Sequence, residues 1–263
     1  MSIKNWLITG DTHREFSRFK EYDEKYNNSE TAVIILGDAG LNYMMNAKDN
    51  EIKKYLIDKY KFFIYCIKGN HEGRPQNVKN MLHIYDENVN GYIWMQPEYP
   101  TIRYFDEYGI YKINGMRTAI IGGAYSVDKY YRLSTGKKWF ADEELSDEEM
   151  DDCLKLMMGQ HFDLVLTHTC PLSYEPTDLF LKEVDQSSVS KRMENFLYKL
   201  SNNIHWDIWC FGHFHADRIE APYVEQYFRD TEELSAIVSR WQKYDTTGKL
   251  DWWLTCGPNF GGN

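Results

Sequence analysis

The stretch DIWCFGHFH, residues 207–215, shows the pattern on which the fold prediction rests. A short apolar run, typical of a buried strand, is followed at once by a glycine and two histidines. Four other apolar runs end in polar residues: WLITG leads to Asp11-Thr12-His13, AVIILG to Asp38, FFIYCIKG to Asn70-His71-Glu72, and DLVLT to His168. Because ligands bind beyond the carboxyl ends of strands in α/β sheets, we expect these five strand ends to meet at one site.

The first part of the chain alternates strand and helix signals. Residues 3–9, 32–36 and 62–67 are expected strands, and residues 15–26 and 47–60 are expected helices. This βαβαβ order predicts parallel strands covered by helices.

The rest of the chain mixes several kinds of element. Between Gly91 and Gly122 short strands follow one another closely, which is typical of antiparallel hairpins. A capping box of Ser146 and Glu149 begins a helix with an apolar stripe. The remaining expected elements are strands in DLVLT and DIWCF, helices near 190–202 and 224–241, and a late strand at 252–256. Together they predict an α/β protein with mixed strand connections, in which two sheets pack face to face with helices outside.

Composition narrows the class of protein. The 263 residues are 43% hydrophobic and contain no repeat or linker, so we expect one domain over residues 1–263. No apolar run is long enough to cross a bilayer and no secretory signal opens the chain, which predicts a cytoplasmic protein without a membrane partner. The net charge of −10 favours a small phosphate ester over long nucleic acid. Nothing in the sequence predicts a protein partner.

The polar residues at the strand ends are metal-ligand types. Side chains two residues apart in extended chain point the same way, so Asp11 with His13, and His213 with His215, each offer two donors to one centre. Imidazole and carboxylate ligands suit Zn, Mn, Fe, Co or Ni. The seven donors are Asp11, His13, Asp38, Asn70, His168, His213 and His215. They are too many for one ion but fit two ions bridged by Asp38, with positive charge left for a hydroxide and a phosphate.

The ordered motifs DTH, GD, GNHE, a lone histidine after a strand, and GHFH resemble the calcineurin-like metallophosphoesterase family. The resemblance implies a four-layer αββα sandwich with two mixed sheets. It also implies hydrolysis of phosphate mono- or diesters by a hydroxide that two divalent ions activate, with Mn²⁺ expected first and Fe, Zn, Ni or Co as alternatives.

The resemblance also implies roles for single residues. One ion would be held by Asp11, His13, Asp38 and His215, and the other by Asp38, Asn70, His168 and His213. His71 would protonate the leaving oxygen or stabilise transition-state charge. His71 and the bridging Asp38 are the two expected catalytic residues. The segment GDAGLNY lacks the arginine of the GDxVDRG pattern, which disfavours the phosphoprotein branch, and no family motif follows Ala216.

Several alternatives accompany this interpretation. Arg74 or Arg132 could grip phosphate through two parallel hydrogen bonds, although the loop at 125–138 could equally be a solvated surface. Asp11 and Asp38 could be helix N-caps, which would not explain the histidines. The lone histidines His83, His161 and His205 are expected to be satisfied core residues. The alternative function is a non-catalytic binding or scaffold protein with the same fold.

Overall fold

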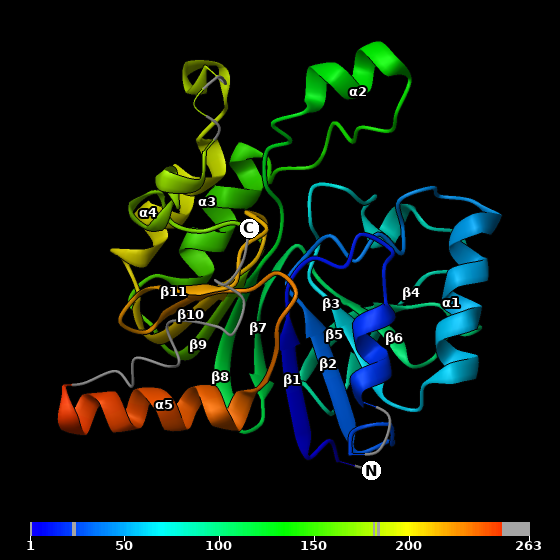
Figure 1. The fold of residues 1–263 in the computed structure, drawn as a ribbon, viewed down its shortest axis with the longest axis horizontal. Helices are drawn as coiled ribbons and strands as arrows, with labels where there is room; N and C mark the ends of the chain where they lie inside the picture. The colour runs from blue at the N-terminus through cyan, green and yellow to red at the C-terminus, as the bar shows by residue number, and fades with distance from the viewer. Residues whose placement is uncertain (1, 23–24, 181, 183–184, 249–263) are drawn as a thin grey trace, which may run out of the picture.

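Two mixed β-sheets lie face to face in the computed structural model, which describes residues 2–22, 25–180, 182 and 185–248 (Figure 1). The first sheet has the order β13-β1-β2-β3-β6-β5-β4, with β1, β2, β3 and β6 parallel. Its strands are β1 (Asn5–Thr9), β2 (Thr31–Ile35), β3 (Phe63–Cys66), β4 (Leu82–Asp86), β5 (Gly91–Met95), β6 (Ile102–Phe105) and β13 (Thr231–Glu233).

The second sheet has the order β11-β12-β10-β9-β8-β7, with β8, β9, β10 and β12 parallel. Its strands are β7 (Tyr108–Ile113), β8 (Met116–Ile121), β9 (His161–Thr167), β10 (His205–Phe211), β11 (Arg218–Ala221) and β12 (Val224–Gln226). In both sheets the antiparallel pairs come at the edges, so the strands that carry the histidine and aspartate motifs occupy the parallel centre.

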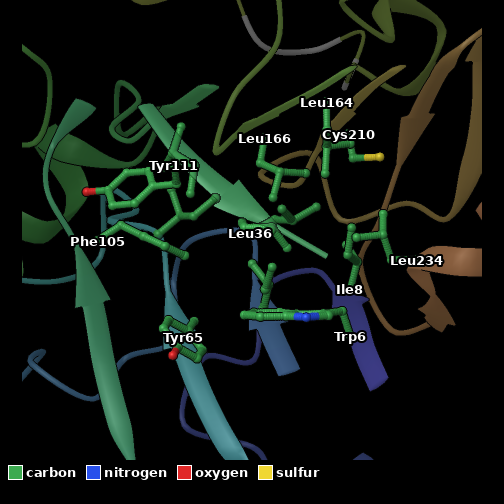
Figure 2. Packing of buried hydrophobic residues seen from close by; sticks show 14 of the residues in the cluster. Trp6, Ile8, Leu36, Tyr65, Phe105, Tyr111, Leu164, Leu166, Cys210 and Leu234 are labelled. Atoms are coloured by element: carbon green, nitrogen blue, oxygen red, sulfur yellow. The ribbon is translucent and has the colours of Figure 1, made fainter. Parts of the chain in front are cut away.

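Side-chain alternation along the strands creates three hydrophobic layers. In β1, Trp6 and Ile8 point between the sheets, whereas Leu7 joins the outer layer. Figure 2 shows the inner layer, where Trp6 and Tyr65 of the first sheet lie opposite Leu164 and Leu166 of the second. Burial of both faces explains why these strands are apolar at nearly every position.

Helices cover the two outer faces. The helix α1 (Ala47–Lys59) and the 3₁₀-helix η1 (Ser17–Tyr22) lie on the first sheet, and α3 (Asp147–Met157) and α4 (Arg192–Ser201) lie on the second (Figure 1). The capping box of α3 forms as expected, since Glu149 N donates to Ser146 Oγ and Ser146 N donates to Glu149 Oε2. The structure therefore confirms two mixed sheets flanked by helices.

Four shorter elements and two further helices complete the chain. The helix α5 (Leu234–Thr247) packs against β1 and β13 at the edge of the sandwich, and α2 (Lys129–Thr135) projects beyond the sheets (Figure 1). The 3₁₀-helices are η2 (Pro75–Asn77), η3 (Leu172–Tyr174), η4 (Thr177–Leu179) and η5 (Gln186–Ser188). No helix in the described part of the chain has the length and apolarity that spanning a bilayer needs.

Some predicted boundaries were wrong. The helix expected at 15–26 is reduced to η1, and the segment at 224–241 first forms β12 and β13 before α5 begins at Leu234. Pairing of β12 with β10 and of β13 with β1 outweighs the local helical pattern there. The loop at 125–138 contains α2, and β4 and β11 were not predicted. The late strand expected at 252–256 lies outside the described residues.

Candidate metal centre

The carboxyl ends of β1, β2, β3, β9 and β10 meet at one edge of the sandwich. Asp11, Asp38, Asn70 and His168 are buried there, and His213 joins them beside β10. Sequence separations are large: Asp11 Oδ1 accepts a hydrogen bond from the backbone of His213 at 3.0 Å, across 202 positions. The prediction that five strand ends meet is confirmed.

Asp11, His13 and His215 form the first group of donors. His13 Nε2 lies 2.9 Å from His215 Nε2, and Asp11 Oδ2 lies 3.3 Å from His215 Nε2 and 3.7 Å from His13 Nε2. Asp11 Oδ2 is buried and has no hydrogen-bond partner. Burial alone would raise the pKa of Asp11, but the close contact with His215 and the charges of the nearby imidazoles outweigh it and hold the pKa below its usual value. An ionised carboxylate with a free oxygen is therefore directed at two imidazole nitrogens.

Asp38, Asn70 and His168 form the second group. The Asn70 amide is oriented by its partners: Ser126 Oγ donates to Glu143 Oε2 at 2.5 Å, so it accepts from Asn70 Nδ2 at 2.9 Å. The Oδ1 atom of Asn70 is thereby left facing His168 Nε2 at 2.8 Å.

The tautomer of His168 follows in the same way. Its Nδ1 atom lies 2.8 Å from the backbone carbonyl of Leu36, which can only accept, so Nδ1 carries the proton and the neutral ring has a lone pair at Nε2. Two acceptor atoms, Asn70 Oδ1 and His168 Nε2, then face each other at hydrogen-bond distance. A cation bound between them would make this contact favourable. Asp38 Oδ1 lies 3.7 Å from the same His168 nitrogen.

Asp38 lies between the two groups. While Oδ1 faces His168, Oδ2 is 3.9 Å from His13 Nε2, so each carboxylate oxygen is on a different side. Oδ1 also accepts from the backbone N–H of His71 at 2.7 Å. Burial would raise the pKa of Asp38, but the positive charge that His168 and His71 carry when protonated lowers it below its usual value. The two carboxylate oxygens of Asp38 therefore face different groups of donors.

His213 is placed beside His168, with ring centroids 5.0 Å apart. Burial, followed by the neighbouring His168, lowers the pKa of His213 to about 3, so its ring is neutral and can offer a lone pair. No group of three close donors in the described chain includes it.

The backbone at the site is strained. Asp38, His13, His213 and His215 all have positive φ, at 49°, 45°, 70° and 55°, a region that costs side-chain-bearing residues energy. A Cβ atom on Gly69 would overlap the Asp38 carboxylate. This backbone conformation is retained because it directs side chains of separate loops toward the same site.

His71 and Arg132 form a pair at the rim. Arg132 Nη2 donates to His71 Nδ1 at 2.6 Å, and Arg132 is itself held by Asp128, at 2.7 and 2.8 Å, and by Tyr43 OH. Because Nδ1 accepts from a guanidinium, the proton of a neutral His71 ring resides on Nε2. Burial, opposed by Asp38 and reinforced by Arg132, lowers the pKa of His71.

The guanidinium of Arg74 is not positioned to bind a phosphate at the candidate metal centre. Its guanidinium binds both carboxylate oxygens of Glu149, and it also donates to the carbonyls of Asp142 and Glu144. The structure thus uses Arg74 to connect the GNHE loop to the start of α3.

The prediction that the three lone histidines are core residues was wrong. His83, His161 and His205 are all exposed, and two of them are bonded to carboxylates: His83 Nε2 to Asp106 and His161 Nε2 to Asp207, each at 2.9 Å. They lie on the amino-terminal halves of edge and central strands, where a side chain reaches solvent.

Ser126 and Glu143 are functional candidates that the sequence did not reveal. Both are buried, and Glu143 accepts from the backbone and the hydroxyl of Ser126. They lie 56 and 73 positions after Asn70 in a segment without motif. No spacing signal could have found them.

The centre opens into a cavity of about 430 Å³. Asp38, Asn70, His71, His213 and His215 form one wall, and residues of the segments 125–128 and 175–194 form the others. The candidate ligands are therefore accessible from one side.

The model of the calcineurin-like phosphoesterase family matches residues 5–217. The chain belongs to this family. The match includes every strand-end motif and stops just after the GHFH segment, so α5 lies beyond it.

Two solved structures resemble this member of the family distantly. Phosphopantetheinyl hydrolase (PptH) from Mycobacterium tuberculosis is 12% identical, with 98% of each chain covered and a TM-score of 0.39. The sulfate thiohydrolase SoxB of Thermus thermophilus is 11% identical, with 88% of this chain and 52% of that chain covered and a TM-score of 0.34. Among curated proteins, none matches the sequence significantly.

Proposed function

We propose that this chain hydrolyses phosphate mono- or diesters with the help of two divalent metal ions. The observation that carries the proposal is the contact of Asn70 Oδ1 with His168 Nε2, two acceptors facing each other at 2.8 Å beside the carboxylate of Asp38. The buried Asp11 Oδ2, which accepts no hydrogen bond and faces the Nε2 atoms of His13 and His215, supports a second ion on the other side of Asp38. Membership of the phosphoesterase family gives the reaction class.

The donors fit two ions. Asp11, His13, Asp38 and His215 would hold one, and Asp38, Asn70, His168 and His213 the other. Such a pair lowers the pKa of a bound water and neutralises charge on a phosphate. Nitrogen and oxygen donors without thiolate suit Mn, Fe, Zn, Ni or Co, and of these Mn²⁺ is the ion that the family resemblance leads us to expect first.

His71 is proposed to act on the leaving oxygen. Arg132 Nη2 is closer to Nδ1, at 2.6 Å, than to Nε2, at 3.3 Å, so Nδ1 is the acceptor and Nε2 carries the proton. We assign this Nε2–H to the leaving oxygen, either to protonate it or to stabilise its charge. Arg132 fixes the orientation and the tautomer of the His71 ring. We therefore assign Arg132 to phosphate binding through His71 and through its positive charge, and not through two parallel hydrogen bonds to the phosphate. The substrate is proposed to be a small ester, in keeping with a cavity of about 430 Å³.

The test uses protein stripped by a chelator and then reloaded separately with Mn²⁺, Zn²⁺, Ni²⁺ or Mg²⁺. A panel of aryl mono- and diesters is assayed at each step, with elemental analysis alongside. We expect two ions per chain and activity that returns only with metal. Protein that holds two ions and cleaves no ester would overturn the enzyme assignment.

The scaffold alternative is not favoured, because the donors and the GNHE histidine are all present in the sequence. Of the seven donors, Asp11, His13, Asp38, His168 and His215 fall into groups whose ligand atoms lie within 4.8 Å of one another. A scaffold has no need for two bound ions, so metal stoichiometry and turnover together separate the two functions.

A further inference from the structure

The cavity beside the metal centre determines what group the phosphate may carry. It shares Asp38, Asn70 and His71 with the centre, so a phosphate bound at the donors directs its ester group into this space. The identity of that ester group is a question that rests on the proposed function.

One wall of the cavity is apolar although it faces solvent. Val127 is 66% exposed and Leu179 44% exposed, and both line the cavity together with Phe180, Val189 and Phe214. Exposed apolar side chains that gather around a concave site mark a ligand surface.

Two aromatic rings give this wall a fixed shape. Phe180 stacks on Phe214 with ring centroids 6.1 Å apart and planes at 27°, and Phe214 packs edge-on against the buried Phe211. Because Phe214 comes between His213 and His215 in the chain, the aromatic surface begins at the metal centre itself.

The charged residues of the cavity favour an uncharged or cationic group. Among the described lining residues Lys191 is the one lysine or arginine, and its ammonium is already bound by Glu175 at 2.7 Å and lies over Phe180 at 4.7 Å. Asp128 is paired with Arg132.

Glu194 adds a buried acidic group to the lining of the cavity. Its Oε1 atom accepts from Thr169 Oγ1 at 2.7 Å, while Oε2 is buried and has no hydrogen-bond partner. Burial raises the pKa of Glu194 to about 7. A negatively charged ester group would meet the carboxyl of Glu194, while the lysine of the described lining is already paired with Glu175.

We propose that the ester group of the substrate is apolar or aromatic, carries no negative charge, and binds against Phe180. Esters with a second phosphate or a carboxylate are thereby poor substrates, and esters of uncharged aromatic or apolar alcohols are good ones.

The test compares two esters that differ in one charge: 4-carbamoylphenyl phosphate and 4-carboxyphenyl phosphate, assayed with the Mn²⁺-loaded full chain. We expect kcat/KM to be about tenfold or more higher for the carbamoyl compound, which is about 1.4 kcal/mol. The Glu194→Gln variant should narrow this ratio. Equal values, or a preference for the carboxylate, overturn the inference and leave the proposed function intact; cleavage of neither ester overturns both.

A second comparison tests the aromatic wall. Phe180→Ala should raise KM for phenyl phosphate up to about tenfold, since one aromatic contact contributes this much, and should leave KM for methyl phosphate and the metal content unchanged. Tyr198→Ala, an exposed aromatic on α4 outside the cavity, is the matched control. An unchanged KM for phenyl phosphate in Phe180→Ala contradicts the proposed position of the ester group.

Discussion

Ser126 should determine how tightly the metal ion at Asn70 is held. Its hydroxyl is the acceptor that orients the Asn70 amide, and the Ser126→Ala substitution removes this acceptor without changing any proposed ligand. The lost hydrogen bond is worth about 0.5–1.5 kcal/mol, and the amide becomes free to present either its nitrogen or its oxygen to the ion. Loss of such a partner behind a ligand typically weakens metal binding by about 10- to 100-fold.

The assay is a competition titration of Mn²⁺ against a fluorescent chelator, which resolves two binding events per chain. In Ser126→Ala we expect one event to weaken by about 10- to 100-fold while the other stays within about threefold. Ser126→Thr keeps a hydroxyl and should restore much of the affinity, and Ser134→Ala, an exposed serine of α2, should have no effect. Two wild-type affinities in Ser126→Ala would refute the orientation argued for Asn70.

Three further predictions address catalysis, backbone and pH. His71→Ala should lower kcat by about 10²- to 10⁴-fold with two ions still present by elemental analysis, and loss of both ions would contradict its assigned role. Gly69→Ala should displace Asp38 because the added Cβ overlaps its carboxylate, which is measured as a loss of bound metal in protein that still shows native circular dichroism. The hydrogen bond from Arg74 lowers the pKa of Glu149 from 4.5 to about 2, so its stabilising contribution is complete above pH 4.5 and is lost as the pH falls towards 2. Denaturant unfolding of wild type should therefore lose more stability over that interval than unfolding of Glu149→Gln, and parallel curves would show that the pair contributes nothing.

The site was more predictable than the element boundaries. Asp11, His13, Asp38 and His168 could be chosen because each follows an apolar run, and parallel strands place their carboxyl ends at one edge. The segment at 224–241 was predicted as one helix because its apolar residues recur with a helical period. In the structure, pairing with β10 and β1 determines the conformation of its first part. Such pairing depends on residues far away in the chain.

The sequence alone determined which side chains gather at the candidate metal centre, since each follows an apolar run and together they form the ordered motifs that resemble the family. Only the tertiary structure decided how those side chains are held. The amide of Asn70 is turned by Ser126 and Glu143, the ring of His71 is fixed by Arg132, and the cavity wall comes from a segment that carries no motif. The physical reason is that hydrogen-bond direction and cavity shape depend on contacts between distant segments, which the period of a strand or helix does not specify.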